Sequence, residues 1–228
     1  MVAIAMLSGC ATGQSSLMMS DFEETRDSVR VLMMEPDVSM FFFTTGGQEM
    51  RADWTERATE NLSSALRTEL ENSGETVIQF VASEGGTEEI RQLLLLNEAV
   101  TQTVRDHVGI AGANVIPSPL PHRAARRLDY TLGAQATELA DAFDADYAAF
   151  LVSRAQFESS GVFMRSVFVG TLTGFVPASQ RFRGTYVSLV DLKSGDVVWV
   201  NGRTVGDPRD PEEAADIAAA IMESSPLN

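Results

Sequence analysis

Asp146-Tyr147-Ala148-Ala149-Phe150-Leu151-Val152-Ser153 is the segment from which the architecture of this chain follows. Its interior is apolar without a break, and a polar residue bounds it at each end. Short apolar runs of this kind are typical of strands that are buried on both faces of a sheet. We therefore place residues 146–153 as a buried strand, preceded directly by a short helix from Ala134 to Phe143.

Two further strands follow this one and form a hairpin. They cover Arg183 to Leu192 and Asp196 to Asn201, and the turn-forming set Lys193-Ser194-Gly195 lies between them. Such a short connection between two apolar segments predicts an antiparallel pair.

The end of the chain predicts a helix with a well-marked start. Asp210 is a suitable cap, Pro211 fits the first helical position, and Glu212 and Glu213 favour the positive end of the helix dipole. Ala-rich sequence continues this helix to about Met222.

Four elements precede the buried strand. We predict strands over Ser28–Met34 and Thr76–Ala82, and helices over Asp53–Glu71 and about Thr87–Val108. In the first helix an apolar residue recurs at every fourth position, and we expect Asp53 to cap it.

Phe41, Phe42 and Phe43 are adjacent, so an extended segment would place them on both faces of a sheet. They form either a short strand in the core or a patch that binds a partner. We favour the core.

The order of these elements is strand, helix, strand, helix, helix, strand, hairpin, helix. It predicts an α/β (or α+β) fold in which helices pack on a mixed sheet, with a C-terminal antiparallel hairpin and helix. We expect residues 26–228 to form a single domain.

The amino terminus carries the one cysteine of the 228-residue chain. The apolar run from Val2 to Leu7, the small residues Ser8 and Gly9, and then Cys10 have the arrangement of a lipoprotein signal. We predict a signal peptide over residues 1–9, cleavage between Gly9 and Cys10, lipid on the Cys10 thiol, and a polar tether over residues 10–25. The alternative is an apolar terminus with a free cysteine.

The location of the protein follows from a resemblance to lipoproteins of bacteria with two membranes. In those proteins an Asp directly after the lipidated cysteine retains the protein in the inner membrane, whereas Ala11 and Thr12 occupy the corresponding positions here. The resemblance implies an outer-membrane protein that faces the periplasm. Acyl chains contribute about 0.8 kcal/mol for each buried methylene, so two or three of them suffice as an anchor.

The formal net charge of −15 argues against binding to nucleic acid, because polyanions would be repelled. Arg123, Arg126 and Arg127 form a small basic cluster in a proline-rich connection. The cluster could meet lipid phosphate or an acidic partner, but we favour a solvated loop.

The sequence offers few groups for catalysis. Its two histidines, His107 and His122, lack the spacing of a zinc site, and Asp141, Asp144 and Asp146 lack the glycine and glutamate of a calcium loop. We therefore expect no enzyme activity, no metal and no cofactor apart from the covalent lipid. An enzyme that uses acids and a bound metal stays the least favoured alternative.

The segment from Val162 to Val176 is apolar and contains no acidic residue. It is either a buried element behind the hairpin or a surface that contacts the membrane or another subunit. The contact residues in the second case are Phe163, Val167, Phe168, Leu172 and Phe175.

Two segments resemble motifs of envelope lipoproteins. They are Asp144-Ala145-Asp146-Tyr147 and Val190-Asp191-Leu192-Lys193-Ser194-Gly195-Asp196-Val197-Val198-Trp199. Similar segments occur in curli-secretion lipoproteins, neisserial GNA-type lipoproteins and the amino-terminal domain of the Tol-Pal propeller protein.

The resemblance implies non-enzymatic work as a scaffold or as an accessory factor in assembly or secretion. The implied partners are the membrane, reached through the lipid, and an envelope protein or further copies of this chain. The alternative is a binding module that holds a small apolar or lipid ligand near Phe41–Phe43 and Phe163–Phe175.

Overall fold

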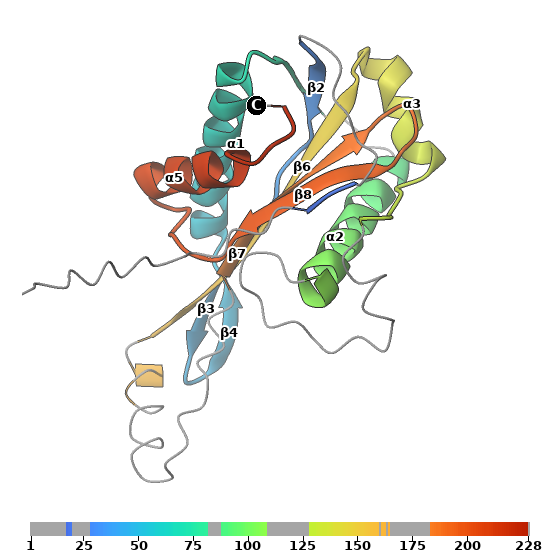
Figure 1. The fold of residues 1–228 in the computed structure, drawn as a ribbon. Helices are drawn as coiled ribbons and strands as arrows, with labels where there is room; N and C mark the ends of the chain where they lie inside the picture. Colours follow the sequence, from blue (N-terminus) through green and yellow to red (C-terminus); the bar gives the residue numbers. More distant parts are fainter. Residues whose placement is uncertain are drawn as a thin grey trace, which may run out of the picture.

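The computed structural model describes residues 17–19, 28–81, 88–108, 128–159, 161–162, 164 and 183–227. These residues form an α/β fold of three layers, in which a mixed eight-stranded sheet lies between two layers of helices (Figure 1). The predicted fold class, the C-terminal hairpin and the C-terminal helix are confirmed.

Six strands follow one another across the sheet. In spatial order they are β1 (Leu17–Met18), β8 (Val197–Arg203), β7 (Arg183–Asp191), β6 (Tyr147–Glu158), β2 (Arg30–Met33) and β5 (Thr76–Gln79). Two more, β3 (Asp37–Thr44) and β4 (Gly47–Met50), form a hairpin that continues the sheet beside the second half of β6.

The 12-residue strand β6 organises the sheet. One of its edges pairs antiparallel with β7, and the other pairs in parallel with β2 and then with β3. Pro36 separates β2 from β3. Because proline has no backbone N–H to donate, it interrupts the pairing at this point and divides one long edge into two strands.

The helices divide between the two faces of the sheet. Helices α1 (Ala52–Asn72) and α5 (Pro211–Met222) cover one face, and α2 (Glu88–Val108) and α3 (Ala134–Phe143) cover the other. Alternate residues of β6 supply the two cores: Ala149 and Leu151 face α1, whereas Ala148 and Phe150 face α2. This double coverage explains why the segment that marked the fold is apolar without a break.

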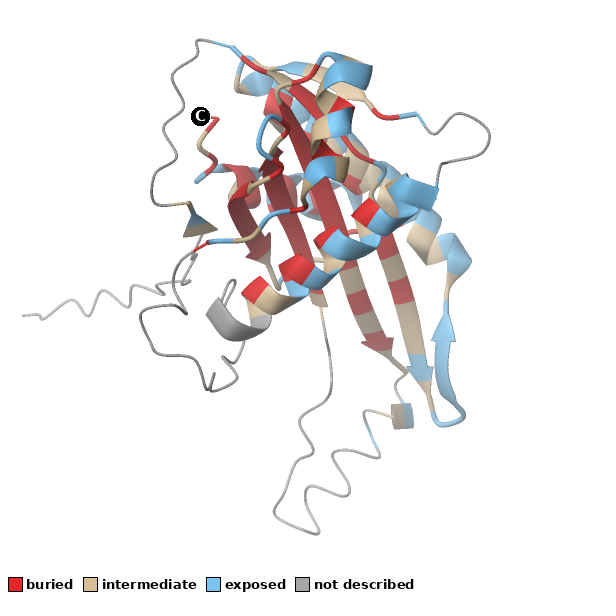
Figure 2. Ribbon diagram, turned by 90° about the vertical axis from the view of Figure 1, so that its right-hand side faces the viewer, coloured by how far each residue is buried: buried red, intermediate tan, exposed pale blue. Residues whose placement is uncertain are grey.

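The coverage stops partway along β6. Every residue from Tyr147 to Ser153 is buried, but from Arg154 onward buried and half-buried residues alternate. The second half of the strand is therefore fully covered on the α1 side alone, which Figure 2 shows as alternating colours toward the β3–β4 hairpin. We call this part of the molecule the hairpin end and define it by residues 41–51, 155–158 and 183–184.

The opposite end of the sheet is formed by short turns. It comprises residues 144–146 and 191–196, and we call it the turn end. Here Asp144, which follows α3, adopts a left-handed conformation with φ of 49°. Asp146 accepts a hydrogen bond from the backbone N–H of Arg30 at 3.1 Å, which links β2 to the start of β6.

An aromatic ring lies flat across two strands on the α2 side. Tyr186 of β7 is 3% exposed, and its ring covers Gly184 and Gly202 so closely that a Cβ at either glycine would overlap it. Both strands therefore need glycine where the ring crosses.

Two sequence predictions are wrong in detail. Arg51, not Asp53, is the residue before the first turn of α1, and the Asp53 carboxylate instead binds the Arg51 guanidinium. Phe41 to Phe43 do form a strand, but they lie beyond the part of the sheet that is covered on both faces, so they are half-buried or exposed and do not belong to the buried core.

Two strands have no counterpart among the predictions. Strand β4 lacks an apolar alternation, and all four of its residues are exposed. Strand β1 has two residues, lies inside the range expected to be a tether, and pairs with the edge of β8.

Candidate docking surface at the hairpin end

A group of arginine and aromatic side chains lies on the α1 side of the hairpin end, and we call it the cationic aromatic cluster. It is assembled from the start of α1, from β3, β6 and β7, and from the loop between β8 and α5. Its members are Phe42, Arg51, Asp53, Trp54, Phe157, Arg183, Asp207 and Arg209.

Three rings form the apolar part of the cluster. Trp54 meets Phe42 and Phe157 edge to face, and both pairs of ring centroids are 5.5 Å apart. This geometry is favourable because the positive edge of one ring points at the negative face of the next. The rings pack against the core that α1 and α5 form with the sheet.

Guanidinium groups stack on these rings. Arg209 lies between two of them, with its Cζ 4.2 Å from the Trp54 centroid and 3.8 Å from the Phe157 centroid. Arg51 covers Trp54 at 4.5 Å, and Arg183 covers Phe157 at 4.4 Å. Each stacked cation contributes about 0.5–2 kcal/mol, and more when water is excluded.

Two of the three arginines also hold a carboxylate. Arg209 binds Asp207 with two nitrogens at 2.8 and 2.5 Å, and Arg51 binds Asp53 with two nitrogens at 3.0 and 2.9 Å. Arg183 differs, because its Nε is buried and has no hydrogen-bond partner in the described part of the chain. The cluster therefore contains one guanidinium nitrogen whose N–H is not used in a hydrogen bond among the described residues.

The arginines shift the protonation of their partners. Burial raises the pKa of Asp207, but hydrogen bonds from Arg209 and the charges of Arg209 and Arg183 outweigh burial, so the pKa lies below its ordinary value of 3.8. The hydrogen bond from Arg51 lowers the pKa of Asp53. Both carboxylates are consequently ionised at neutral pH.

The other face of the hairpin end carries exposed apolar side chains. Phe41 and Phe43 of β3 pair with Met50 and Gln48 of β4, so these four side chains lie on the face away from Trp54. Phe43 is 38% exposed and Met50 is 59% exposed. The hairpin end thus combines an apolar face with a cationic aromatic one.

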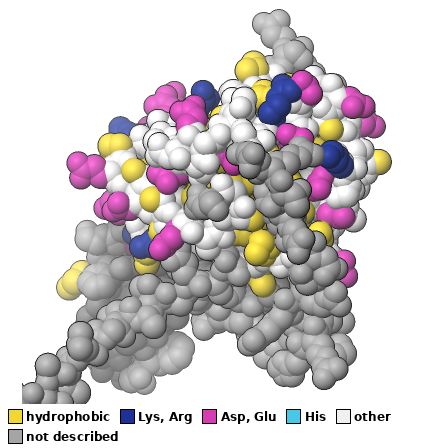
Figure 3. Space-filling model, turned by 45° about the horizontal axis from the view of Figure 1, so that its top comes forward, with side chains coloured by type: hydrophobic (Ala, Val, Ile, Leu, Met, Phe, Trp, Pro, Cys, Tyr) yellow, Lys and Arg dark blue, Asp and Glu magenta, His cyan; other side chains and the backbone are white. Residues whose placement is uncertain are grey.

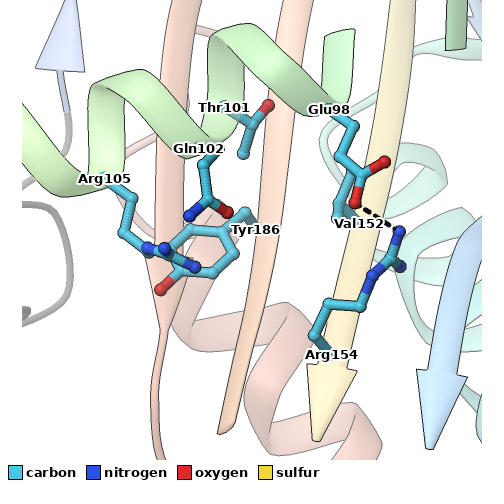
Figure 4. Close-up of a pocket in the computed structure, with 7 residues that line it drawn as sticks. All are labelled: Glu98, Thr101, Gln102, Arg105, Val152, Arg154 and Tyr186. Carbon is cyan, nitrogen blue, oxygen red and sulfur yellow. Dashed lines mark hydrogen bonds and ion pairs between the residues drawn. The ribbon is translucent and has the colours of Figure 1, made fainter. Parts of the chain in front are cut away.

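A polar hollow lies between α2 and the sheet (Figure 4). Its empty volume is about 270 Å³, part of it open to solvent, and its lining consists of Glu98, Thr101, Gln102, Arg105, Val152, Arg154 and Tyr186. The phenylalanines expected around an apolar ligand are not among these residues.

Arg154 ties α2 to the sheet at this hollow. Its guanidinium binds the carboxylates of Asp37 at 2.6 Å and Glu98 at 2.7 Å, and it also donates to the Asp37 carbonyl at 2.7 Å. Burial lowers the pKa of Arg154, but the hydrogen bonds and charges of the two carboxylates outweigh burial and raise it. Arg154 is therefore a permanent cation that is already satisfied within the protein.

The residues predicted from the sequence as contacts lie outside the described part of the chain. They are Gly9, Cys10, Phe163, Val167, Phe168, Leu172 and Phe175, and the basic cluster Arg123, Arg126 and Arg127 and His122 lie outside it as well. The structure describes the strands on either side of the apolar segment: β6 ends at Glu158 opposite Phe43, and β7 begins at Arg183 opposite Ala155.

Other predicted polar residues have structural roles. His107 belongs to the last turn of α2. Asp210 caps α5, as predicted, by accepting hydrogen bonds from the backbone N–H groups of Glu212 and Glu213. Asp207, which the sequence analysis grouped with Asp210, instead binds Arg209, and only the folded structure reveals the two rings on either side of that arginine.

The described residues contain no group of three or more His, Cys, Asp or Glu side chains that could hold a metal ion. Among the helices of the described part, none has the length and apolar character needed to cross a membrane.

The direction of β1 shows from which side the chain reaches the sheet. Strand β8 runs toward the hairpin end, where Arg203 lies opposite Thr185. Strand β1 is antiparallel to β8, with Leu17 opposite Val200 and Met18 opposite Trp199. The chain therefore enters β1 from the side of the hairpin end.

No protein-family model and no curated protein sequence matches this chain. Similar solved structures include the PelC dodecamer from Paraburkholderia phytofirmans, at 14% sequence identity and a TM-score of 0.40, with 94% of this chain and 95% of that chain covered. The LpoB C-terminal domain from Salmonella enterica is 15% identical, with a TM-score of 0.27 and coverage of 77% and 81%. Lipoprotein GNA1162 from Neisseria meningitidis is 11% identical, with a TM-score of 0.30 and coverage of 78% and 79%.

Proposed function

We propose that this protein is a lipid-anchored scaffold or accessory factor of the bacterial envelope, with no chemistry of its own. Lipid on Cys10 holds it at the outer membrane, and the folded domain faces the periplasm. The observation that carries the proposal is that the chain enters β1 from the side of the hairpin end, the end that also carries the candidate docking surface.

The composition of the hairpin end supports a docking role. Aromatic residues, Met and Arg are enriched where proteins bind partners, and Trp and Arg supply much of the binding energy there. The hairpin end and the cationic aromatic cluster on it present all three kinds of residue, among them Phe43, Trp54, Met50 and Arg183. What docks there in this proposal is an envelope component: the membrane that the lipid enters, an envelope protein or further copies of this chain.

The apolar segment predicted from the sequence belongs to the same proposal. Its contact residues are Phe163, Val167, Phe168, Leu172 and Phe175, and the two strands that flank it in the sequence, β6 and β7, end and begin at the hairpin end. We propose that it contacts the membrane or the partner.

The anchor is tested by replacing the thiol that carries it. We expect Cys10→Ser to lose the lipid and to appear in the soluble fraction or as the unprocessed precursor, whereas the matched Ser15→Ala variant stays with the outer membrane. Fractionation on a sucrose gradient with immunodetection measures both. If Cys10→Ser fractionates with membranes as the parent does, the proposed function fails.

A second variant tests the sorting rule. Ala11→Asp places an acidic residue directly after the cysteine, and we expect it to move the protein from outer-membrane to inner-membrane fractions of the same gradient. An Ala11→Asp protein that still sediments with the outer membrane contradicts the proposed location.

A further inference from the structure

We propose that the hairpin end lies directly against the phospholipid surface, with Phe43 and Met50 entering the interface and Arg183 donating to lipid phosphate. This inference rests on the proposed function, because it assumes the anchor on Cys10. It adds an orientation and a second membrane contact that the anchor alone does not require.

Chain length agrees with this orientation. Through the pairing of β1, β8, β7 and β6, Leu17 is level with Phe150, eight residues before the end of β6 at Glu158. Eight strand residues span about 26 Å. Cys10 precedes Leu17 by seven residues, which reach at most about 25 Å when extended. At full extension Cys10 therefore comes about level with the end of β6, and the diacylglyceryl group on its sulfur would continue from there toward the plane of the hairpin tip.

The exposed apolar residues lie where this plane would be. Phe43 adjoins the tip, which Thr44, Thr45 and the following two glycines form, and Met50, opposite Phe41, lies on the same face two residues further from the tip. Both belong to the β3–β4 hairpin, and Figure 2 shows this hairpin extending past the helices that cover the sheet, with much of its ribbon coloured as exposed. An aromatic and a flexible apolar side chain at such a tip favour the boundary between headgroups and acyl chains.

The two ends also differ in charge, and this difference favours the hairpin end as the side that meets the lipid. At the turn end, acidic residues outnumber basic ones: it has Asp144, Asp146, Asp191 and Asp196 against Lys193. Figure 3 looks toward this end and shows more acidic than basic side chains. At the hairpin end, arginines and acids balance: it has Arg51 and Arg183 against Glu49 and Glu158.

An anionic lipid surface would therefore repel the turn end and accept the hairpin end. Within the hairpin end, Arg183 is the residue suited to a phosphate oxygen. Its partners in the cluster, Arg51 and Arg209, each already hold a carboxylate, whereas the Arg183 guanidinium forms no ion pair with a carboxylate among the described residues. A phosphate would satisfy this donor with a charge-assisted hydrogen bond.

The experiment uses the lipidated full-length mature protein in vesicles of phosphatidylethanolamine and phosphatidylglycerol. Since Cys10 is the only native cysteine, Thr45→Cys at the hairpin tip can be labelled specifically with the dye NBD. We expect its emission to shift to the blue and to be quenched by nitroxide-labelled lipids. The matched label at Ser194→Cys, in the turn end, should show neither effect.

Two pairs of substitutions test the named residues in the Thr45→Cys protein. Phe43→Ser with Met50→Ser should abolish the shift and the quenching, whereas Leu95→Ser with Leu96→Ser, which removes comparably exposed apolar residues from α2, should leave both unchanged. Arg183→Gln should reduce the quenching in vesicles, and circular dichroism should show that each variant is folded.

The outcomes separate this inference from the proposed function. If the protein floats with the vesicles but the Thr45 label behaves like the Ser194 label, the inference is wrong and the anchor stands. A blue shift without quenching by nitroxide lipids would mean that protein covers the hairpin, which also overturns the inference. A protein that does not float with vesicles contradicts the anchor itself.

Discussion

At the scale of single residues, Tyr186 determines which residue types two neighbouring strands can have at the positions beneath its ring. Its ring fills the space above Gly184 and Gly202, so the sheet in this region is held by one aromatic side chain lying across two glycines. Because both glycines are buried beneath the ring, an added methyl group has no room unless the ring moves.

We expect Gly202→Ala to lower the free energy of unfolding by about 1–3 kcal/mol, the usual cost of overpacking a core. Gly46→Ala, where the nearest atom to the added Cβ is 3.6 Å away, should cost less than about 0.5 kcal/mol. Urea unfolding followed by circular dichroism measures both. Equal midpoints for the two variants would show that the ring does not constrain Gly202.

Residue-scale predictions succeed where the determinants are local. The sequence Asp210-Pro211-Glu212 predicts the start of α5 correctly, because cap and helix are adjacent in the chain. At α1 the same reasoning selects Asp53, but Arg51 precedes it and binds its carboxylate, and the extended backbone of Arg51 places the first turn two residues earlier.

At the scale of elements, the cationic aromatic cluster joins parts of the chain that are distant in sequence. Trp54 of α1, Phe157 of β6 and the loop that carries Asp207 and Arg209 meet around one guanidinium group. Since Asp207 orients this guanidinium, its ionisation should stabilise the folded protein.

We expect Asp207→Asn to lower the free energy of unfolding at about pH 7 by roughly 1–2 kcal/mol, since hydrogen bonds to charged groups are worth about that much. The folded pKa lies below the ordinary 3.8, so the carboxylate stabilises the protein fully above 3.8 and loses this effect as the pH falls through the lowered value. The difference in the free energy of unfolding between the parent and Asp207→Asn should therefore become smaller in acid.

Urea midpoints measured across this pH range check the prediction, with Asp216→Asn on the exposed face of α5 as the control. The prediction is contradicted if the difference in urea midpoint between the parent and Asp207→Asn stays constant down to the lowest pH. It is also contradicted if Asp216→Asn shifts the midpoint equally.

The sequence predicts elements better than their contacts. The long helices and the apolar strands can be predicted from the sequence because the spacing of their apolar residues reflects burial. In α1, for example, the regularly spaced residues Ala58, Leu62 and Leu66 are buried. Strand β4 has no buried residue, so its sequence shows no apolar alternation from which a strand could be predicted. The cluster needs side chains from several elements, and only the tertiary fold brings them together.

At the scale of the whole molecule, the fold separates two ends of different character. The turn end has acidic turns, whereas the hairpin end has arginines, aromatic rings and exposed apolar residues. The chain enters β1 from the side of the hairpin end. This arrangement depends on strand directions across the sheet, which the linear sequence does not contain. A protein held by lipid at one end and presenting its other end to the periplasm suits a scaffold.

The most direct test is mass spectrometry of the amino-terminal peptide from protein isolated from its native membranes. The account predicts that the mature chain begins at Cys10 and carries a diacylglyceryl group on the sulfur, with a mass increase equal to the attached lipid. A peptide that retains Met1, or a Cys10 with an unmodified thiol, would contradict it.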